Sequence, residues 1–253
     1  MRIKTFMAAI MLVPAFSAPV LAQERMDHTA HTKQPDEASA AAHAHGSEIY
    51  HAFKLETDMG AGKEGPVSRW DFDGWIGSDE NKLWLKSEGE ISDGSTEQAE
   101  FWGLYSRNVS TFWDAQIGIR HDFQPVSTSY LVLGIEGLAP YFIETEAHLF
   151  ISDEGDVSAR LRREHDLLIT QRLILQPYVE VNLFAQDVPE QDIGAGLTDA
   201  EIGLQTRYEF TRKLAPYVDV RYERKFGETS SIAKNNGEEN DDFIAALGLR
   251  LMF

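Results

Sequence analysis

Apolar and polar residues alternate along most of the chain after residue 48, in segments of about ten residues that are separated by turns. Successive side chains of a β-strand point to opposite faces, so this alternation predicts strands with one apolar and one polar face. Strands of about ten residues are long enough to cross a bilayer at a tilt. The predicted strands are 48–57, 67–77, 81–91, 97–107, 111–122, 128–138, 141–151, 156–167, 172–184, 197–209, 215–226 and 242–253.

The number and spacing of these segments predict an all-β fold, an antiparallel transmembrane β-barrel of about twelve strands. An even strand number places both ends of the barrel on one side of the membrane, which is typical of bacterial outer-membrane barrels. We expect short turns near 77–80, 107–110, 139–140 and 212–213, and longer acidic loops near 58–66, 92–96, 152–155, 185–196 and 227–241. Short turns on the periplasmic side and longer loops on the external side are also typical of outer-membrane barrels.

The last predicted strand carries an apolar residue at every second position and ends the chain on Phe253. This ending resembles the terminal signal of outer-membrane β-barrels. We expect the strand to pair with the first one near residues 50–57 and to direct Arg250 into the lumen, toward an acidic side chain. The apolar face consists of Phe243, Ala245, Leu247, Leu249, Leu251 and Phe253.

The other strands divide in the same way into a lipid-facing and a lumen-facing set. Trp84 and Trp102 interrupt the alternation, and the pattern does not assign them to a face. Aromatic residues near strand ends, expected in the interfacial girdles, are Trp75, Tyr141, Tyr208 and Tyr222. The lipid-facing set is Trp70, Phe72, Trp113, Ile117, Ile119, Leu131, Leu133, Ile135, Ile143, Leu149, Leu161, Val179, Val181, Leu183, Ile202, Leu204, Val218 and Val220. The lumen-facing charged set is Arg69, Asp71, Asp73, Glu144, Glu146, His148, Arg160, Arg162, Glu164, Glu201, Arg207, Asp219, Arg221, Glu223 and Arg250.

Composition narrows the classes of function. The chain has 253 residues, no Cys and a formal net charge of -18, so disulfides and thiolate metal sites are excluded and nucleic acid is not an expected partner. Residues 1–22 have a basic start, an apolar core and a Val20-Leu21-Ala22 cleavage motif, which predict a signal peptide. We therefore expect a protein of the outer membrane of a Gram-negative bacterium, with outer-membrane lipid as a partner.

Residues 23–47 have no hydrophobic period and hold four of the eight His, so we predict a disordered, His-containing tail in the periplasm before a barrel over 48–253. Imidazole and carboxylate groups suit Cu(II), Zn(II) and Ni(II), and a thioether favours Cu(I). The tail is thus a candidate metal-binding segment. Its candidate ligands, with one His that follows the tail, are Met26, Asp27, His28, His31, His43, His45 and His51.

A second candidate metal site lies on one predicted strand of the barrel. Glu144, Glu146 and His148 place two carboxylates and an imidazole on the same inward face, with neighbouring Cβ atoms about 7 Å apart. This spacing allows ligation with help from another strand. The same residues are also expected in any polar lumen, where Arg160 and Arg162 of the next strand could pair with the carboxylates.

The leader, Met26-Asp27-His28, the His-rich tail and the barrel together resemble the copper resistance protein B family of outer-membrane proteins. The most specific stretches are residues 71–77 (DFDGWIG), 134–142 (GIEGLAPYF) and 173–177 (LILQP). The resemblance implies a role in copper handling, with copper ions bound as cargo rather than as a catalytic cofactor, alongside periplasmic copper-binding proteins. Members often carry several Met- and His-rich repeats in the tail, whereas this chain has one Met-Asp-His.

Three functions are compatible with the sequence. The first is a non-enzymatic, copper-binding outer-membrane barrel. The second is a general small porin or structural barrel. The third is a phospholipase-type hydrolase, which would need a Ser activated by a His on the outer face. In that architecture His and Ser are two residues apart on one strand, but the residues two places after His121, His148 and His165 are Phe123, Phe150 and Leu167.

Overall fold

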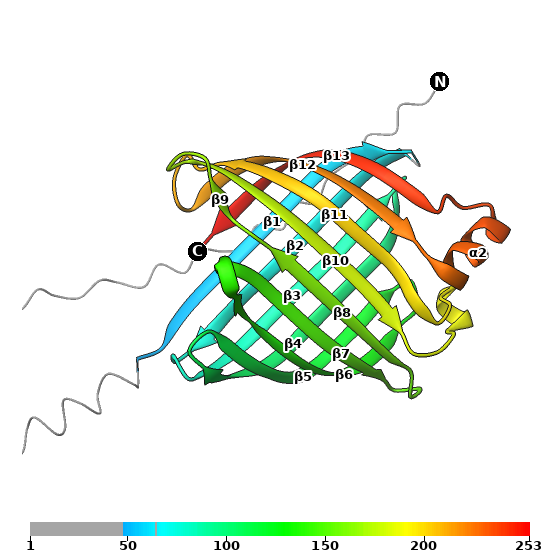
Figure 1. The fold of residues 1–253 in the computed structure, drawn as a ribbon, viewed down its shortest axis with the longest axis horizontal. Helices are drawn as coiled ribbons and strands as arrows, with labels where there is room; N and C mark the ends of the chain where they lie inside the picture. The colour runs from blue at the N-terminus through cyan, green and yellow to red at the C-terminus, as the bar shows by residue number, and fades with distance from the viewer. Residues whose placement is uncertain (1–47, 64) are drawn as a thin grey trace, which may run out of the picture.

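The computed structural model describes residues 48–63 and 65–253, which form a closed antiparallel β-barrel with a short helix at one end (Figure 1). Twelve long strands pair with their neighbours in chain order, and the two-residue strand β9 pairs only with β10. The elements are β1 (Tyr50–Gly62), β2 (Gly65–Gly77), β3 (Asn81–Ser92), β4 (Ser95–Ser110), β5 (Trp113–Gln124), β6 (Thr128–Ala139), η1 (Pro140–Phe142), β7 (Ile143–Ser152), β8 (Val157–Glu164), β9 (Leu167–Leu168), β10 (Leu173–Phe184), η2 (Pro189–Gln191), β11 (Gly196–Tyr208), β12 (Leu214–Lys225), α2 (Gly227–Asn236) and β13 (Asp241–Met252).

The barrel closes between its first and last strands, as predicted. β1 pairs with β13 from Lys54 opposite Met252 to Ala61 opposite Ala245, so the paired stretch of β1 is 54–61 rather than 50–57. The Phe253 amide continues the ladder by donating to the Phe53 carbonyl at 2.9 Å. We call the end where β1 begins and β13 ends the terminal end, and the opposite end, which carries α2, the helical end.

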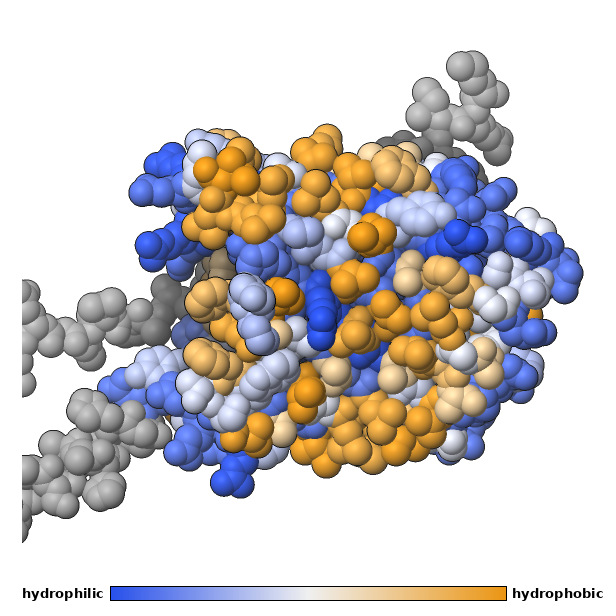
Figure 2. Space-filling model, in the orientation of Figure 1, coloured by the Kyte–Doolittle hydropathy of each residue, from blue (hydrophilic) through white to orange (hydrophobic). Residues whose placement is uncertain are grey.

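The predicted outward faces are apolar and exposed, as expected of a wall that contacts lipid. Ile119, Ile202 and Leu247 are 67%, 61% and 69% exposed. Figure 2 shows apolar side chains spread over the visible wall and hydrophilic side chains gathered at the helical end. Among the described residues, no helix is long and apolar enough to cross a membrane.

Apolar side chains fill one wall of the interior. They include the two tryptophans that the alternation did not assign to a face. Trp84 and Trp102 both point inward, with exposures of 9% and 2%. Trp75 packs against the same cluster rather than joining the outer girdle, because it shares the inward parity of Asp71 and Asp73 on β2. The cluster consists of Trp84, Trp102, Leu104, Tyr130, Val132 and Phe150.

The connections differ from the expected alternation of short and long. Residues 58–62 and 65–66 belong to strands, so the first loop shrinks to 63–64. Asp93 and Gly94 form a two-residue turn in which both residues have positive φ (45° and 82°), a conformation that Asp-Gly favours. Only 185–195 and 226–240 are long at the helical end, and the terminal end has its own long connection at 165–172.

The two long connections at the helical end pack on each other and on the barrel mouth. The Gly194 amide donates to Thr229 Oγ1 of α2 at 3.0 Å. Gln191 reaches Tyr130 on the inner wall of β6, with 3.0 Å between Nε2 and the hydroxyl. The turn at Lys63 is held to the start of β13, because Lys63 Nζ donates to Asp241 Oδ2 at 2.5 Å and this hydrogen bond raises the pKa of the lysine. These contacts fix the rim around the lumen.

Candidate functional site

The lumen contains a cavity of about 750 Å³ that extends from the middle of the barrel to the helical end. Its lining comes mainly from β1–β3, β8 and β10–β13, and it also includes Tyr130 and Phe150 of the aromatic cluster. The lining includes eighteen Asp and Glu but only six Arg and Lys. Such an excess of carboxylates in a partly enclosed cavity attracts cations and repels anions.

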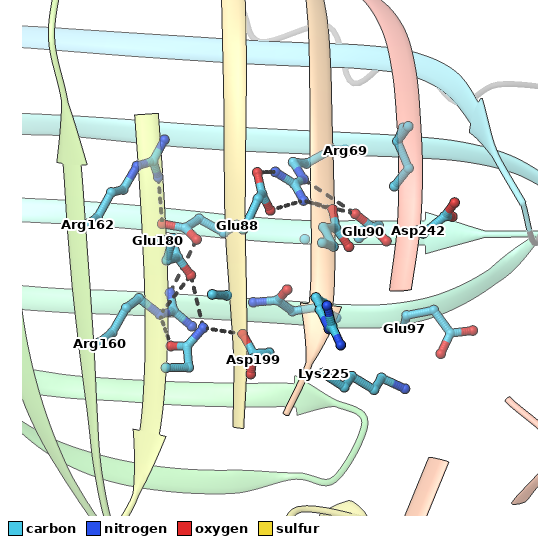
Figure 3. Close-up of a pocket in the computed structure, with 18 of the residues that line it drawn as sticks. Arg69, Glu88, Glu90, Glu97, Arg160, Arg162, Glu180, Asp199, Lys225 and Asp242 are labelled. Atoms are coloured by element: carbon cyan, nitrogen blue, oxygen red, sulfur yellow. Dashed lines mark hydrogen bonds and ion pairs between the residues drawn. The ribbon is translucent and has the colours of Figure 1, made fainter. Parts of the chain in front are cut away.

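Arg69 of β2 organises the acidic side chains on one side of the cavity (Figure 3). Its guanidinium makes a two-pronged contact with Glu201, with Nη1–Oε1 and Nη2–Oε2 distances of 3.0 and 2.9 Å. Nη2 also lies 3.0 Å from Glu223 Oε1 and 3.3 Å from Glu90 Oε2. Arg221 also contacts Glu223 and Glu90, so two cations hold these three carboxylates, and this group keeps a net negative charge.

Arg160 and Arg162 of β8 bridge the lumen. Arg160 Nη1 donates to Glu100 Oε1 at 2.8 Å and to Glu88 Oε2 at 3.3 Å. Arg162 Nη1 donates to Asp71 Oδ2 at 3.4 Å, and β8 lies six positions from β2 in the twelve-strand order, on the opposite side of the barrel. The interior is therefore crossed by ion pairs at mid-height instead of being an unobstructed pore.

The inward orientation of Glu144, Glu146 and His148 on β7 agrees with the pattern, but their side chains have different partners. Glu146 Oε2 accepts from Lys86 Nζ at 2.6 Å. His148 is 4% exposed, and its Nε2 lies 2.8 Å from Gln116 Oε1. Glu144 is exposed at the terminal end. Within 48–63 and 65–253, no three His, Asp or Glu side chains are arranged to hold a metal ion.

His148 also has a packing role that the alternation could not indicate. Its ring covers Gly134 on β6, where an added Cβ would lie 2.3 Å from His148 Cδ2. The ring meets Trp102 edge-on, with 5.2 Å between centroids. Lys86 is a further lumen residue that the alternation does not indicate, because its neighbour on the inward face of β3, Trp84, is apolar. The parity of 84, 86, 88 and 90 is the signal that would have found it.

The candidate ligands in the tail, Met26, Asp27, His28, His31, His43 and His45, lie outside the described residues. His51 stands at the start of β1, exposed at the terminal end. Its ring lies 6.0 Å from that of Phe53, which is on the outward face.

A His–Ser pair occurs on the outward face of the barrel, across two strands rather than along one. His121 of β5 faces Ser129 of β6, with 3.0 Å between Nδ1 and Oγ. The other contact of the ring is edge-on with Phe123, with a centroid separation of 4.6 Å. In the described part of the chain, no carboxylate or amide orients this imidazole, so the pair lacks the third group of a catalytic triad.

Comparisons with known proteins agree with this architecture. The family model described as copper resistance protein B precursor (CopB) matches residues 50–253. Copper resistance protein B of Escherichia coli is 44% identical over 185 residues, which cover 73% of this chain and 62% of that protein. The copper resistance protein B homolog of Pseudomonas syringae pv. tomato is 41% identical over 191 residues, which cover 75% of this chain and 65% of that protein. The matched region thus spans less than two thirds of either relative.

Solved structures with the same architecture are outer-membrane porins. The NanC porin matches with a TM-score of 0.55 at 12% identity, covering 78% of this chain and 98% of that chain. The KdgM porin matches with a TM-score of 0.50 at 11% identity, covering 80% and 99%. At these identities the likeness concerns the fold alone. Family and fold together confirm the outer-membrane β-barrel.

Proposed function

This chain belongs to the copper resistance protein B family, and on that premise we propose that it contributes to copper resistance by binding copper ions and passing them through its lumen. The observation that carries the proposal is the cavity lining, with eighteen acidic and six basic residues. Copper is the cargo in this account, and the barrel is not an enzyme.

We propose that residues 1–22 are a leader, that residues 23–47 are a periplasmic segment, and that this segment captures copper. Its thioether, carboxylate and imidazole groups are ligands for copper in both oxidation states. The proposed ligands are Met26, Asp27, His28, His31, His43 and His45, with His51 where the barrel begins. Periplasmic copper-binding proteins are the proposed exchange partners of this tail.

The lumen contributes an electrostatic path for the captured cation. Glu97 and Asp199 line the cavity and have no Arg or Lys partner among the described residues, so their charge is available to a passing ion. Glu144, Glu146 and His148 would join a copper site only after Lys86 and Gln116 release the latter two. The structure therefore supports attraction along the lumen more directly than a fixed site on β7.

Two other functions fit the structure less well. A general porin needs a clear passage, whereas the Arg162–Asp71 pair joins opposite walls. A lipid hydrolase needs an oriented His, whereas among the described residues the His121 ring contacts only Ser129 and Phe123. The copper function uses the acidic cavity.

Copper binding to the purified full chain tests the proposal. Equilibrium dialysis with copper quantified by mass spectrometry would compare the wild type with two variants, H28A/H31A/H43A/H45A and E144Q/E146Q/H148Q. We expect the tail variant to lose most of the bound copper and the β7 variant to keep it. Equal binding by the tail variant and the wild type would contradict the assignment to the tail.

A further inference from the structure

Arg163 of β8 points out of the barrel, which separates it from its two neighbouring arginines. The β8 pattern places Ser158, Arg160 and Arg162 inward, and Arg163 is the exposed residue of the strand. In the described part of the chain, its guanidinium forms no hydrogen bond or ion pair. The strand arginines that point inward all have acidic partners: Arg69, Arg120, Arg160, Arg162, Arg207, Arg221 and Arg250.

The wall around Arg163 offers no carboxylate. Its direct neighbours across the sheet are Thr145 on β7 and Val179 on β10. The Thr145 hydroxyl is already engaged with the Ile143 carbonyl at 3.4 Å. On the outward faces of β7, β8 and β10, Arg163 is the single charged residue; the others are Ile143, Thr145, Ala147, Leu149, Ile151, Val157, Ala159, Leu161, Leu173, Leu175, Pro177, Val179, Val181 and Leu183.

Arg163 lies near the terminal end of the barrel, beside an aromatic turn. Two residues beyond it, His165 Nδ1 lies 3.1 Å from the Phe142 carbonyl and joins β8 to the turn between β6 and β7. Tyr141 and Phe142 in that turn are 86% and 75% exposed, and both have positive φ (68° and 59°). Aromatic residues exposed at a strand end are typical of the boundary between hydrocarbon and head groups. Arg163 therefore stands at head-group depth, close to that boundary.

We propose that Arg163 binds the phosphate of a phospholipid head group in the leaflet at the terminal end of the barrel. A guanidinium offers two parallel N–H donors that match the oxygens of a phosphate. A lipid supplies this anion together with acyl chains that cover Val179 on β10 and Leu161, two positions away on β8. No inward carboxylate can serve instead, because the sheet separates the two faces. The inference is independent of the copper function.

Native mass spectrometry of the full chain, released from detergent with added lipid, tests the site. The probes are dioleoylphosphatidylglycerol, dioleoylglycerol, which has the same chains without phosphate, and inorganic phosphate. The variants are R163Q, R163K and the matched control R212Q, which removes an exposed arginine from a turn at the same end. Faster migration of unheated samples on denaturing gels confirms that each variant is folded.

We expect R163Q to bind phosphatidylglycerol about tenfold more weakly than the wild type, as expected for the loss of one charged hydrogen-bonding contact. R163K should be intermediate and R212Q unchanged. Three results would overturn the inference. They are equal lipid binding by folded R163Q, equal binding of dioleoylglycerol, or inorganic phosphate binding as tightly as the lipid. A protein that co-purifies with the wild type and is lost from R163Q, with lipid binding unchanged, would assign Arg163 to a protein interface instead.

Discussion

The buried pair between Arg250 and Glu56 shows how single residues stabilise the polar interior at the barrel seam. Arg250 Nε lies 2.5 Å from Glu56 Oε1, and the two side chains are 11% and 8% exposed. Arg250 also donates to Gln176 and Gln205 at 2.9 and 3.1 Å. Removal of one partner from such a pair leaves a buried charge without compensation, which costs more than the intact pair contributes.

We predict that R250L lowers the free energy of unfolding by about 3 kcal/mol, because Glu56 stays buried with Gln205 and Lys54 as its remaining polar partners among the described residues. Urea unfolding in detergent, followed by tryptophan fluorescence, measures this change. The double variant E56L/R250L should recover part of the loss, and R212L, in an exposed turn, should resemble the wild type. A single variant as stable as the wild type would show that water already compensates the pair.

Single residues also show which contacts the sequence predicts and which it does not. The inward position of Arg250 and its acidic partner follow from parity alone, because both depend on the two-residue period of a strand. Parity does not predict that Glu146 pairs with Lys86 rather than with Arg160 or Arg162. This pairing depends on which strands approach each other across the lumen. His148 was a candidate ligand by type, but its contacts with Gly134 and Gln116 are set by packing between strands.

At the scale of elements, the bridge from β8 to β2 and β3 controls how open the lumen is. We predict that R162Q raises the single-channel conductance in planar bilayers, because its ion pairs with Asp71 and Glu88 cross the barrel. R212Q serves as the control, since its side chain lies outside the lumen. If R162Q and the wild type conduct equally, the bridge does not restrict the passage.

The closing strand β13 gives a second prediction at this scale. Phe253 is 63% exposed while its amide bonds to Phe53 at the seam, so the ring contacts the surroundings rather than the core. F253A should therefore lower the fraction of chain assembled in the outer membrane and leave copper binding by the assembled fraction unchanged. Membrane fractionation with gel mobility measures assembly, and F243A, in the same strand away from the terminus, is the control. Normal assembly of F253A would show that the terminal ring is not part of the assembly signal.

Strands were more predictable than the segments that join them. Alternation located all twelve long strands because each has one face in lipid. It overestimated the loops near 58–66 and 92–96, because polar residues at the ends of strands that extend past the membrane look like loop residues. The contacts of Gln191 with β6 and of Gly194 with α2 depend on long-range folding of the loops and have no periodic signal.

At the scale of the whole molecule, the barrel combines an apolar outer wall with an acidic cavity inside. The sequence predicted the architecture and the charged inward face, because both follow from the alternation of apolar and polar residues. It did not predict that an aromatic cluster fills part of the interior, or that Tyr130 and Phe150 of this cluster line the cavity. That arrangement depends on three-dimensional positions, and it leaves an acidic cavity from the middle of the barrel to the helical end.

Copper entry into proteoliposomes tests whether copper ions pass through the acidic lumen. Entrapped calcein, whose fluorescence copper quenches, is the reporter. We predict faster quenching with the wild-type barrel than with empty liposomes, and slower quenching with E97Q/D199N, which removes two cavity carboxylates that have no Arg or Lys partner among the described residues. The conservative substitutions keep side-chain size, and R212Q is the control. Quenching no faster than in empty liposomes, or unaffected by E97Q/D199N, would contradict a copper path through the acidic lumen.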